Sequence, residues 1–233
     1  MSVPVPVILH IETSTNVCSV ALSEGMNCIF KKSNTEGMNH AALLSVFIDE
    51  ALQILKVQSK KLDAVAVSSG PGSYTGLRIG VSTAKGLCYG FNIPLIAVST
   101  LEVMAVSAMK TVKTDSPLLY CPMIDARRME VYAAFYNSDG TVFRDISADI
   151  ITEESYKEEL EENTVCFFGN GSDKCKTVLT HKNAHFIDEI VPLAENMIGL
   201  ALKNYEKNKF EDVAYFEPFY LKEFQTTVPK KGV

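Results

Sequence analysis

One segment combines glycines and hydroxyl groups in a way that suggests phosphate binding. Residues 68–80, SSGPGSYTGLRIG, follow a short apolar run and open a long stretch that is almost free of charge. Glycine-rich turns between a strand and a helix often bind phosphate through the free N–H groups of the helix start. The segment lacks a P-loop pattern, however, because Leu77 follows Gly76, and its glycine spacing does not fit a dinucleotide fingerprint. Phosphate contact at Gly70 and Gly72 is therefore the weaker interpretation.

A polar turn between the first two expected strands is a second candidate. Residues 11–16, IETSTN, offer the carboxylate of Glu12 and three hydroxyl groups at a strand end. Such a turn could bind a metal-bridged phosphate through Thr13 and Ser14, although turns of this composition are also common in proteins without ligands. Nucleotide binding by Thr13 and Ser14 stays a weak alternative.

The histidines do not predict a metal site. His181 and His185 are four residues apart, as zinc ligands on a helix can be, but the residues between and after them suggest a turn and a strand. No third ligand is evident, and neither His10 nor His40 has an identifiable acid partner. A Gly-x-Ser-x-Gly nucleophile motif is absent too. The sequence therefore predicts no catalytic residues and no metal.

A helix expected over 73–90 carries a stripe of small residues. The stripe consists of Gly76, Gly80, Ala84 and Cys88, one every four residues. A glycine inside a helix costs about 1 kcal/mol relative to alanine, so two glycines on one stripe need a compensating contact. Close packing inside the chain's own core would supply that contact, and so would a helix of another subunit.

The neighbouring predicted helix, 39–56, favours the second explanation. Its apolar residues cover about half of its circumference, which is wider than the stripe of roughly 100° that covers one sheet. We therefore expect the two helices to form a partner interface, with Arg78 and Lys85 at its edge. The predicted interface residues are Leu43, Phe47, Ile54, Ser73, Gly76, Ile79, Gly80, Thr83, Ala84 and Leu87.

Hydrophobic patterning predicts two similar sets of elements. The first set has an antiparallel meander of strands and then two strand–helix units, which together predict a mixed sheet with packed helices. Its strands are expected at 5–11, 17–23, 27–33, 62–69 and 93–98, and its helices at 39–56, 73–90 and 99–109. The second set starts near residue 117, with strands around 117–146 and 164–170 and helices at 153–161, 171–180 and 193–208. The predicted fold class is therefore α/β with two related lobes.

Composition limits the function further. The chain of 233 residues is 47% hydrophobic and 21% charged, with a net charge of −6. This balance argues against autonomous binding of tRNA or DNA, which usually needs a basic surface. Six cysteines without C-x-x-C spacing, no signal peptide and no apolar run of membrane-spanning length predict a reduced, cytoplasmic protein.

Five segments resemble one family. ILHIETSTNVCSVAL, SSGPGSYTGLRIGVSTAKGL, IPLIAVSTLEVMA, IDARRMEVYAAFY and EPFYL occur in the order of the TsaB family, also called YeaZ, and spread over residues 8–221. The resemblance implies a two-lobed fold of the actin/hexokinase/Hsp70 type (ASKHA). We expect an N-terminal lobe of residues 1–104, completed by the helix near 193–208, and a C-terminal lobe of 105–192 and 209–233.

The resemblance also implies a role in making N6-threonylcarbamoyladenosine at position 37 of tRNAs. In that pathway the paralogue TsaD transfers the threonylcarbamoyl group, and TsaB is its non-catalytic partner, joined by the ATPase TsaE. The histidine pair that binds metal in TsaD falls here at about Thr100 and Met104, whose hydroxyl and thioether cannot replace two imidazoles. The predicted function is therefore a scaffold subunit that docks on TsaD.

Several alternatives stay open. The chain alone is expected to form a homodimer through the same face, because an exposed apolar surface of this size usually marks a site of protein–protein contact. A standalone ATP-dependent enzyme of the same fold is the rival prediction, and ATP or ADP at or near the complex interface is possible. Contact with tRNA is expected only indirectly, and the sequence does not decide whether Lys222, Lys230 and Lys231 help to position it.

Overall fold

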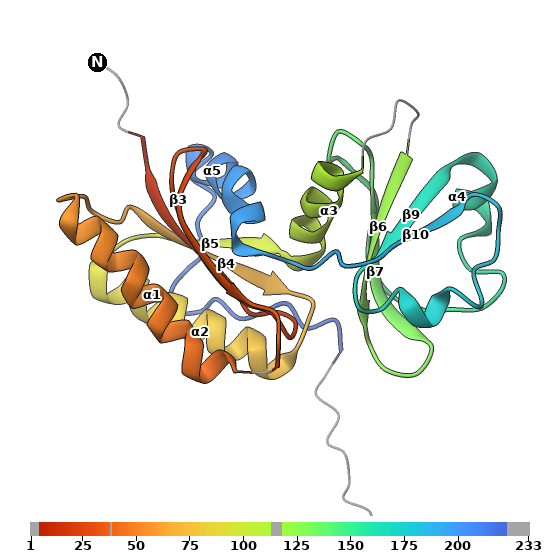
Figure 1. The fold of residues 1–233 in the computed structure, drawn as a ribbon, viewed down its shortest axis with the longest axis horizontal. Coiled ribbons are helices and arrows are strands. Elements are labelled where there is room, and N and C mark those ends of the chain that lie inside the picture. Colours follow the sequence, from red (N-terminus) through yellow and green to blue (C-terminus); the bar gives the residue numbers. More distant parts are fainter. Residues whose placement is uncertain (1–4, 38, 113–117, 223–233) are drawn as a thin grey trace, which may run out of the picture.

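Two five-stranded sheets form the two lobes of this computed structural model, which describes residues 5–37, 39–112 and 118–222 (Figure 1). The first sheet has the order β3-β2-β1-β4-β5 and the second β10-β9-β6-β7-β8. The first consists of β1 (Val7–Glu12), β2 (Cys18–Glu24), β3 (Asn27–Asn34), β4 (Ala64–Gly70) and β5 (Leu95–Ser99). The second consists of β6 (Leu118–Asp125), β7 (Glu130–Tyr136), β8 (Val142–Ile150), β9 (Thr164–Phe168) and β10 (Ala184–Ile187).

The two sheets have the same topology. Read from β8, the second sheet has the order β8-β7-β6-β9-β10, which matches β3-β2-β1-β4-β5 strand for strand. In each sheet the first three strands are antiparallel and the last two pair in parallel. The predicted α/β fold with two related lobes, each a mixed sheet with helices, is thereby confirmed.

Helices cover both faces of the first sheet. On one face α1 (His40–Val57) and α2 (Tyr74–Phe91) lie side by side, over a core that includes Leu9 and Val67. On the other face α5 (Ile198–Glu206), preceded by the 3-10 turn η2 (Ala194–Met197), packs against Ile8 and Ile96. Central strands such as β1 are buried on both faces, which explains why their sequences read as unbroken apolar runs.

One helix packs on both lobes. Helix α3 (Thr100–Thr111) places Met104 and Ala108 in a core with residues of β6, and Val103 in a core with residues of β4 and β5. The predicted lobe boundary between residues 104 and 105 therefore falls inside α3, which packs on both sheets. Within the described ranges, no helix is long and apolar enough to cross a membrane.

The C-terminal tail lies on the first lobe over most of its described length. Glu211 forms a β-bridge with Leu95, and the backbone N–H of Phe219 donates to the carbonyl of Ser69 at 2.7 Å. The prediction that residues 209–222 belong to the C-terminal lobe is therefore wrong, because their backbone bonds are to β4 and β5. Lys222 then reaches the second lobe, where its Nζ lies 2.5 Å from a carboxylate oxygen of Glu130; Lys230 and Lys231 are outside the described residues.

The second lobe has fewer helices than expected. Its outer side carries the short helix α4 (Lys157–Glu162), where 153–161 was predicted. The helix predicted at 171–180 is wrong: only the 3-10 turn η1 (Asp173–Cys175) forms there, because the chain makes isolated turn bonds such as Cys175 N to Ser172 O.

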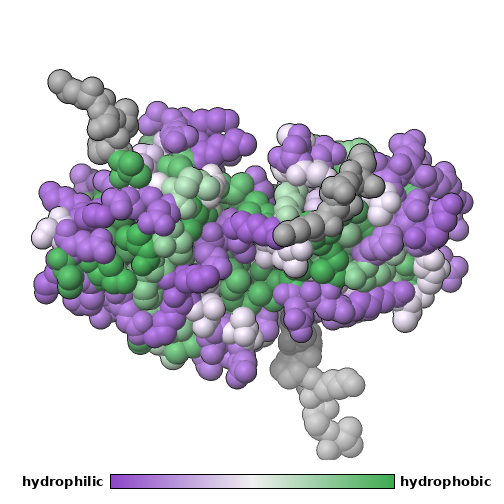
Figure 2. Space-filling view, turned by 45° about the horizontal axis from the view of Figure 1, so that its top comes forward, coloured by the Kyte–Doolittle hydropathy of each residue, from purple (hydrophilic) through white to green (hydrophobic). Residues whose placement is uncertain are grey.

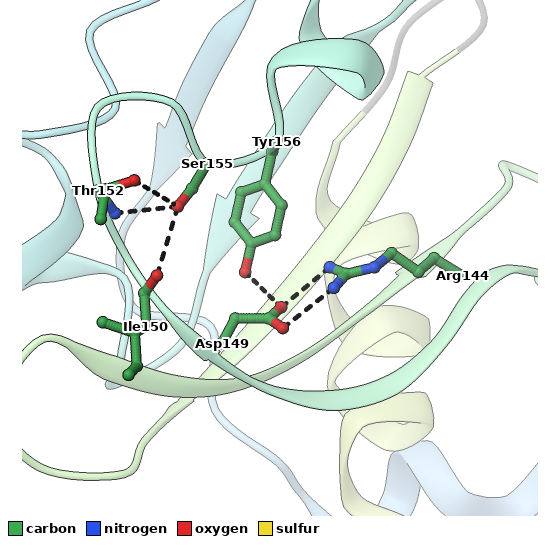
Figure 3. A network of polar contacts seen from close by, with 6 residues as sticks. All are labelled: Arg144, Asp149, Ile150, Thr152, Ser155 and Tyr156. Atoms are coloured by element: carbon green, nitrogen blue, oxygen red, sulfur yellow. Dashed lines mark hydrogen bonds and ion pairs between the residues drawn. The ribbon is translucent and has the colours of Figure 1, made fainter.

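A network of polar contacts fixes β8 to the loop that follows it (Figure 3). Asp149 accepts hydrogen bonds from the guanidinium of Arg144 and from the hydroxyl of Tyr156.

Candidate functional site

The turn between β1 and β2 is folded inward. Glu12 is fully buried, and its Oε1 accepts hydrogen bonds from the backbone N–H and the hydroxyl of Ser14. The hydroxyl of Thr13 donates to the carbonyl of Gly76 at 2.8 Å, and both Thr13 and Ser14 are fully buried. Their hydroxyls are therefore engaged in hydrogen bonds within the chain, and nucleotide binding by Thr13 and Ser14 stays a prediction.

The buried β1–β2 turn packs closely against the glycines of α2 and of the turn before α2. A Cβ at Gly72 would lie 2.2 Å from Ser14 O, one at Gly76 would lie 2.1 Å from Thr13 O, and one at Gly80 would lie 2.2 Å from Thr13 Oγ1. These distances exclude any side chain. Gly76 and Gly80 are thus required by the chain's own β1–β2 turn, and the predicted reason for them, the approach of a partner helix, is wrong.

Two further residues of the predicted interface also point into the first lobe. Ala84 is fully buried and Phe47 is 4% exposed, and both belong to the core between the sheet and the helices α1 and α2. With Gly76 and Gly80 they form the inner side of the helix pair. A partner cannot reach them without unfolding this lobe.

A second stripe of small residues lies on the outer side of α2. Ser82, Gly86 and Gly90 follow one another at intervals of four, and all three are exposed. A Cβ at Gly86 or Gly90 would have no described atom within 4 Å outside its own helical turns. Nothing inside the described chain requires glycine at these positions, and they were not among the predicted interface residues.

Apolar side chains flank this outer stripe. Leu43, Ile79 and Leu87 are partly exposed and rest on the first core, and Ile54, Ser73 and Thr83 are also partly exposed. Val46 and Val57 of α1 are 48% and 85% exposed, and Tyr89 of α2 is 86% exposed. In Figure 2, apolar patches lie on the left-hand lobe, to which α1 and α2 belong, and over the middle of the molecule, whereas the outer end of the other lobe is mainly polar. We call the outer side of α1 and α2, with Ser82, Gly86 and Gly90 at its centre, the docking face.

The two charges of α2 hold the C-terminal tail. Lys85 Nζ donates to the carbonyls of Ala214 and Phe216 at 3.1 and 2.9 Å. The guanidinium of Arg78 lies 4.2 Å from the ring centre of Tyr74, which in turn packs on the ring of Tyr220 at 5.0 Å. Arg78 and Lys85 were expected only to border an interface, and their contacts with the tail could not be inferred from α2 alone.

A cleft separates the two lobes at the carboxyl ends of the central strands. It has a volume of about 520 Å³ and is lined by residues of both lobes, including Ser14, Gly72, Asp125, Arg127 and Tyr220. Gly70 does not line it, because the tail covers that residue: a Cβ there would lie 2.7 Å from Phe219 O. Of the predicted nucleotide-binding residues, only Gly72 and Ser14 therefore reach this cleft.

Thr100 and Met104, the two positions at which the resemblance implies metal ligands in the paralogue, are inside the protein. Thr100 and Met104 are 0% and 1% exposed, and Met104 packs in the core under the second sheet. His185 is on β10, and the Nδ1 of His181 accepts from Asn183 N in the turn before it. Among the residues with a described position, no three His, Cys, Asp or Glu side chains are grouped to hold a metal ion.

Comparison with known proteins agrees with this fold. A structure from Pseudomonas aeruginosa, titled as an uncharacterized protein with similarity to peptidase YEAZ, superposes with a TM-score of 0.76 at 24% identity and covers 93% of this chain and 100% of that one. Residues 35–226 match the family model "TsaD: tRNA N6-adenosine threonylcarbamoyltransferase". The chain is thus a two-lobed ASKHA-type protein related to TsaD.

Full-length relatives define the family more closely. The "tRNA threonylcarbamoyladenosine biosynthesis protein TsaB" of Escherichia coli (strain K12) is 30% identical over 223 residues, which are 92% of this chain and 94% of that protein. A "tRNA N6-adenosine threonylcarbamoyltransferase" of Bartonella bacilliformis is 40% identical, but over only 80 residues, 34% of this chain and 22% of that protein. This chain belongs to the TsaB family, which confirms the resemblance seen in its sequence.

Proposed function

We propose that this chain is a non-catalytic subunit that binds a TsaD-type threonylcarbamoyltransferase through the docking face, in the machinery that makes N6-threonylcarbamoyladenosine in tRNA. The observation that carries this proposal is the outer stripe of Ser82, Gly86 and Gly90 between partly exposed apolar residues. Each interior glycine costs a helix about 1 kcal/mol relative to alanine, and nothing in the described chain compensates Gly86. A partner helix that packs closely against this stripe would compensate it.

The residue types at the two equivalent metal positions support a non-catalytic role. A buried threonine and a buried methionine, Thr100 and Met104, are poor substitutes for two imidazole ligands. The buried hydroxyls of Thr13 and Ser14 are engaged in hydrogen bonds inside the chain. The rival function, a standalone ATP-dependent enzyme, would use the interlobe cleft. It predicts binding and turnover of Mg-ATP by the isolated chain, which calorimetry and a phosphate-release assay would detect.

The docking proposal is tested with the same glycine-to-leucine substitution at two helix positions, one on the docking face and one on the opposite side of the first lobe. Gly86→Leu places a side chain on the docking face, where the folded chain has room for it. Gly199→Leu on α5 is the matched control, because a Cβ there makes only ordinary contacts, with Met26 at 3.5 Å, far from α1 and α2. After co-expression with the TsaD-type protein of the same organism, we expect Gly86→Leu to abolish co-purification and the control to retain it.

The same face explains the expected homodimer. If the isolated chain covers its docking face with a second copy, Gly86→Leu shifts it to a monomer in size-exclusion chromatography, while Gly199→Leu elutes as the wild type does. A folded Gly86→Leu variant that still co-purifies with the TsaD-type protein at full yield would show that the assignment of the docking face is wrong. Gly80, which sequence reasoning would choose for this test, is unsuitable because its replacement disrupts the monomer itself.

A further inference from the structure

A second cavity lies beside the interlobe cleft, and Phe219 and Tyr220 of the tail line both. It has a volume of about 820 Å³ and is bounded by α5, the tail and the carboxyl ends of β4 and β5, where Ser69 and Ser99 line it. In open α/β sheets, ligands characteristically bind outside the carboxyl ends of the parallel strands. The cavity is therefore at a position where a ligand is expected, and no function assigned above uses it.

Three lysines converge on this cavity. Lys203 and Lys207 are four residues apart at the end of α5, so they project from one side of the helix, and Lys209 follows in the tail. All three are exposed, and none of them makes an ion pair or a side-chain hydrogen bond with a described residue. Most other described lysines are engaged in such contacts. Three free ammonium groups around one cavity are notable in a chain whose net charge is −6.

Three acidic side chains, Glu102, Glu211 and Glu217, also line the cavity. Glu102 is half-buried at the start of α3, and burial raises its pKa although Lys203 and Lys209 lower it. Glu217 has a Coulombic interaction with Arg78 of α2. Glu102 and Glu211 are half-buried, whereas the three lysines are exposed. The lysines are thus the groups most available to a ligand.

We propose that Lys203, Lys207 and Lys209 form a binding site for phosphate groups, carried by a free nucleotide or by the backbone of an RNA. Ammonium groups are strong point-charge partners of phosphate. The ring of Phe219, which is 47% exposed, provides a surface beside them on which a base can stack. The site lies on α5 and the tail, so this inference does not rest on the docking face.

The test compares two triple variants with the same change in net charge. In the first, Lys203, Lys207 and Lys209 are replaced with glutamine. In the second, the control, the same replacement is made at Lys56, Lys61 and Lys182, which are also exposed and unpaired with described residues but lie outside the cavity. The probes are a fluorescein-labelled single-stranded RNA, followed by anisotropy at several salt concentrations, and ADP, followed by calorimetry.

For whichever of the two probes wild type binds, we expect the cavity variant to bind at least about tenfold more weakly than wild type. The control variant is expected to bind that probe nearly as well as wild type does. For RNA, the slope of log affinity against log salt falls by about 2 in the cavity variant, since each lost phosphate contact removes roughly 0.7. Glu102→Gln has the opposite effect and tightens binding, because it removes a negative charge from the cavity wall.

Each outcome has a definite meaning. Loss of RNA binding alone identifies a nucleic-acid backbone as the ligand, and loss of ADP binding alone identifies a free nucleotide. Equal losses in both triple variants would reveal only a non-specific charge effect and overturn the proposal. So would a wild-type chain that binds neither probe, or a Glu102→Gln variant that binds more weakly while its melting temperature is unchanged.

Discussion

Replacement of Glu12 with glutamine tests whether the buried β1–β2 turn has the electrostatics that the structure implies. Burial raises the pKa of Glu12 from 4.5 to about 7, although hydrogen bonds from Ser14 lower it. The folded protein therefore holds this proton more tightly than the unfolded chain does. The contribution of Glu12 to stability is largest below pH 4.5, declines as the pH rises from 4.5 to 7 and is constant at its lower level above 7.

The size of this effect follows from the pKa difference. A shift from 4.5 to about 7 corresponds to about 3 kcal/mol, at roughly 1.4 kcal/mol for each pH unit, and most of it falls between pH 5 and pH 8. Glutamine is nearly isosteric, keeps an oxygen that can accept from Ser14, and does not ionise. Relative to wild type, the Glu12→Gln variant should therefore gain about 2 to 3 kcal/mol between pH 5 and pH 8.

A second buried group, His10, changes stability with pH in the opposite direction to Glu12, so the experiment must compare wild type with the variant. Burial lowers the pKa of His10 from 6.5 to about 3, so His10 destabilises the folded protein as the pH falls below 6.5. In wild type the two slopes offset each other between pH 4.5 and 6.5. The difference between wild type and Glu12→Gln cancels the His10 contribution, which both proteins share.

Urea unfolding followed by far-ultraviolet circular dichroism is the suitable assay, because the chain contains no tryptophan. Free energies of unfolding are measured for both proteins at several pH values between 5 and 8, with one common m-value. A difference that stays constant across this range would refute the reasoning, since it would mean that Glu12 titrates alike in the folded and unfolded chains. A constant offset added to the pH-dependent difference would report only the loss of a buried hydrogen bond.

Three further predictions concern stability and the tail. Gly80→Ala should destabilise the protein by several kcal/mol, about 3 or more, because its Cβ overlaps the β1–β2 turn, whereas Gly86→Ala should stabilise it by about 1 kcal/mol; thermal unfolding of both separates the two faces of α2. Lys85→Met should increase hydrogen exchange in residues 211–222, because it removes two bonds to carbonyls of the tail, and a Lys182→Met variant should not. Tyr156→Phe should cost about 1 to 2 kcal/mol in urea unfolding, because the hydroxyl donates to the half-buried Asp149 at 2.8 Å.

Much of the fold could be predicted from local patterns. The apolar runs of β1, β2 and β4 and the helical periodicity of α1 and α2 fall within one or two residues of their predicted limits. The order of elements was enough to predict two related lobes. The tail could not be placed, because an extended segment has no periodicity and its position is decided by backbone bonds to Ser69 and Leu95, far away in the sequence. The helix predicted at 171–180 failed for a similar reason, since its residues form isolated turns.

The sequence prediction and the structure differ most instructively in which stripe of small residues on α2 faces inward. Positions 76, 80 and 84 and positions 82, 86 and 90 are both spaced by four, so helical periodicity alone makes either set a candidate for close packing. Only the location of Thr13, which belongs to a turn more than sixty residues earlier, shows that the first set faces inward. Sequence reasoning therefore assigned to a partner a stripe of α2 that packs against the chain's own β1–β2 turn.

This result changes what the glycines of α2 say about function. The inner glycines at 76 and 80 are required by the β1–β2 turn and would be needed whatever the protein binds. The outer glycines at 86 and 90 have no such requirement, and each weakens the helix by about 1 kcal/mol unless something packs against it. Only the outer set therefore carries information about a partner, and the docking proposal depends on Gly86 rather than on the SSGPGSYTGLRIG segment that first suggested it.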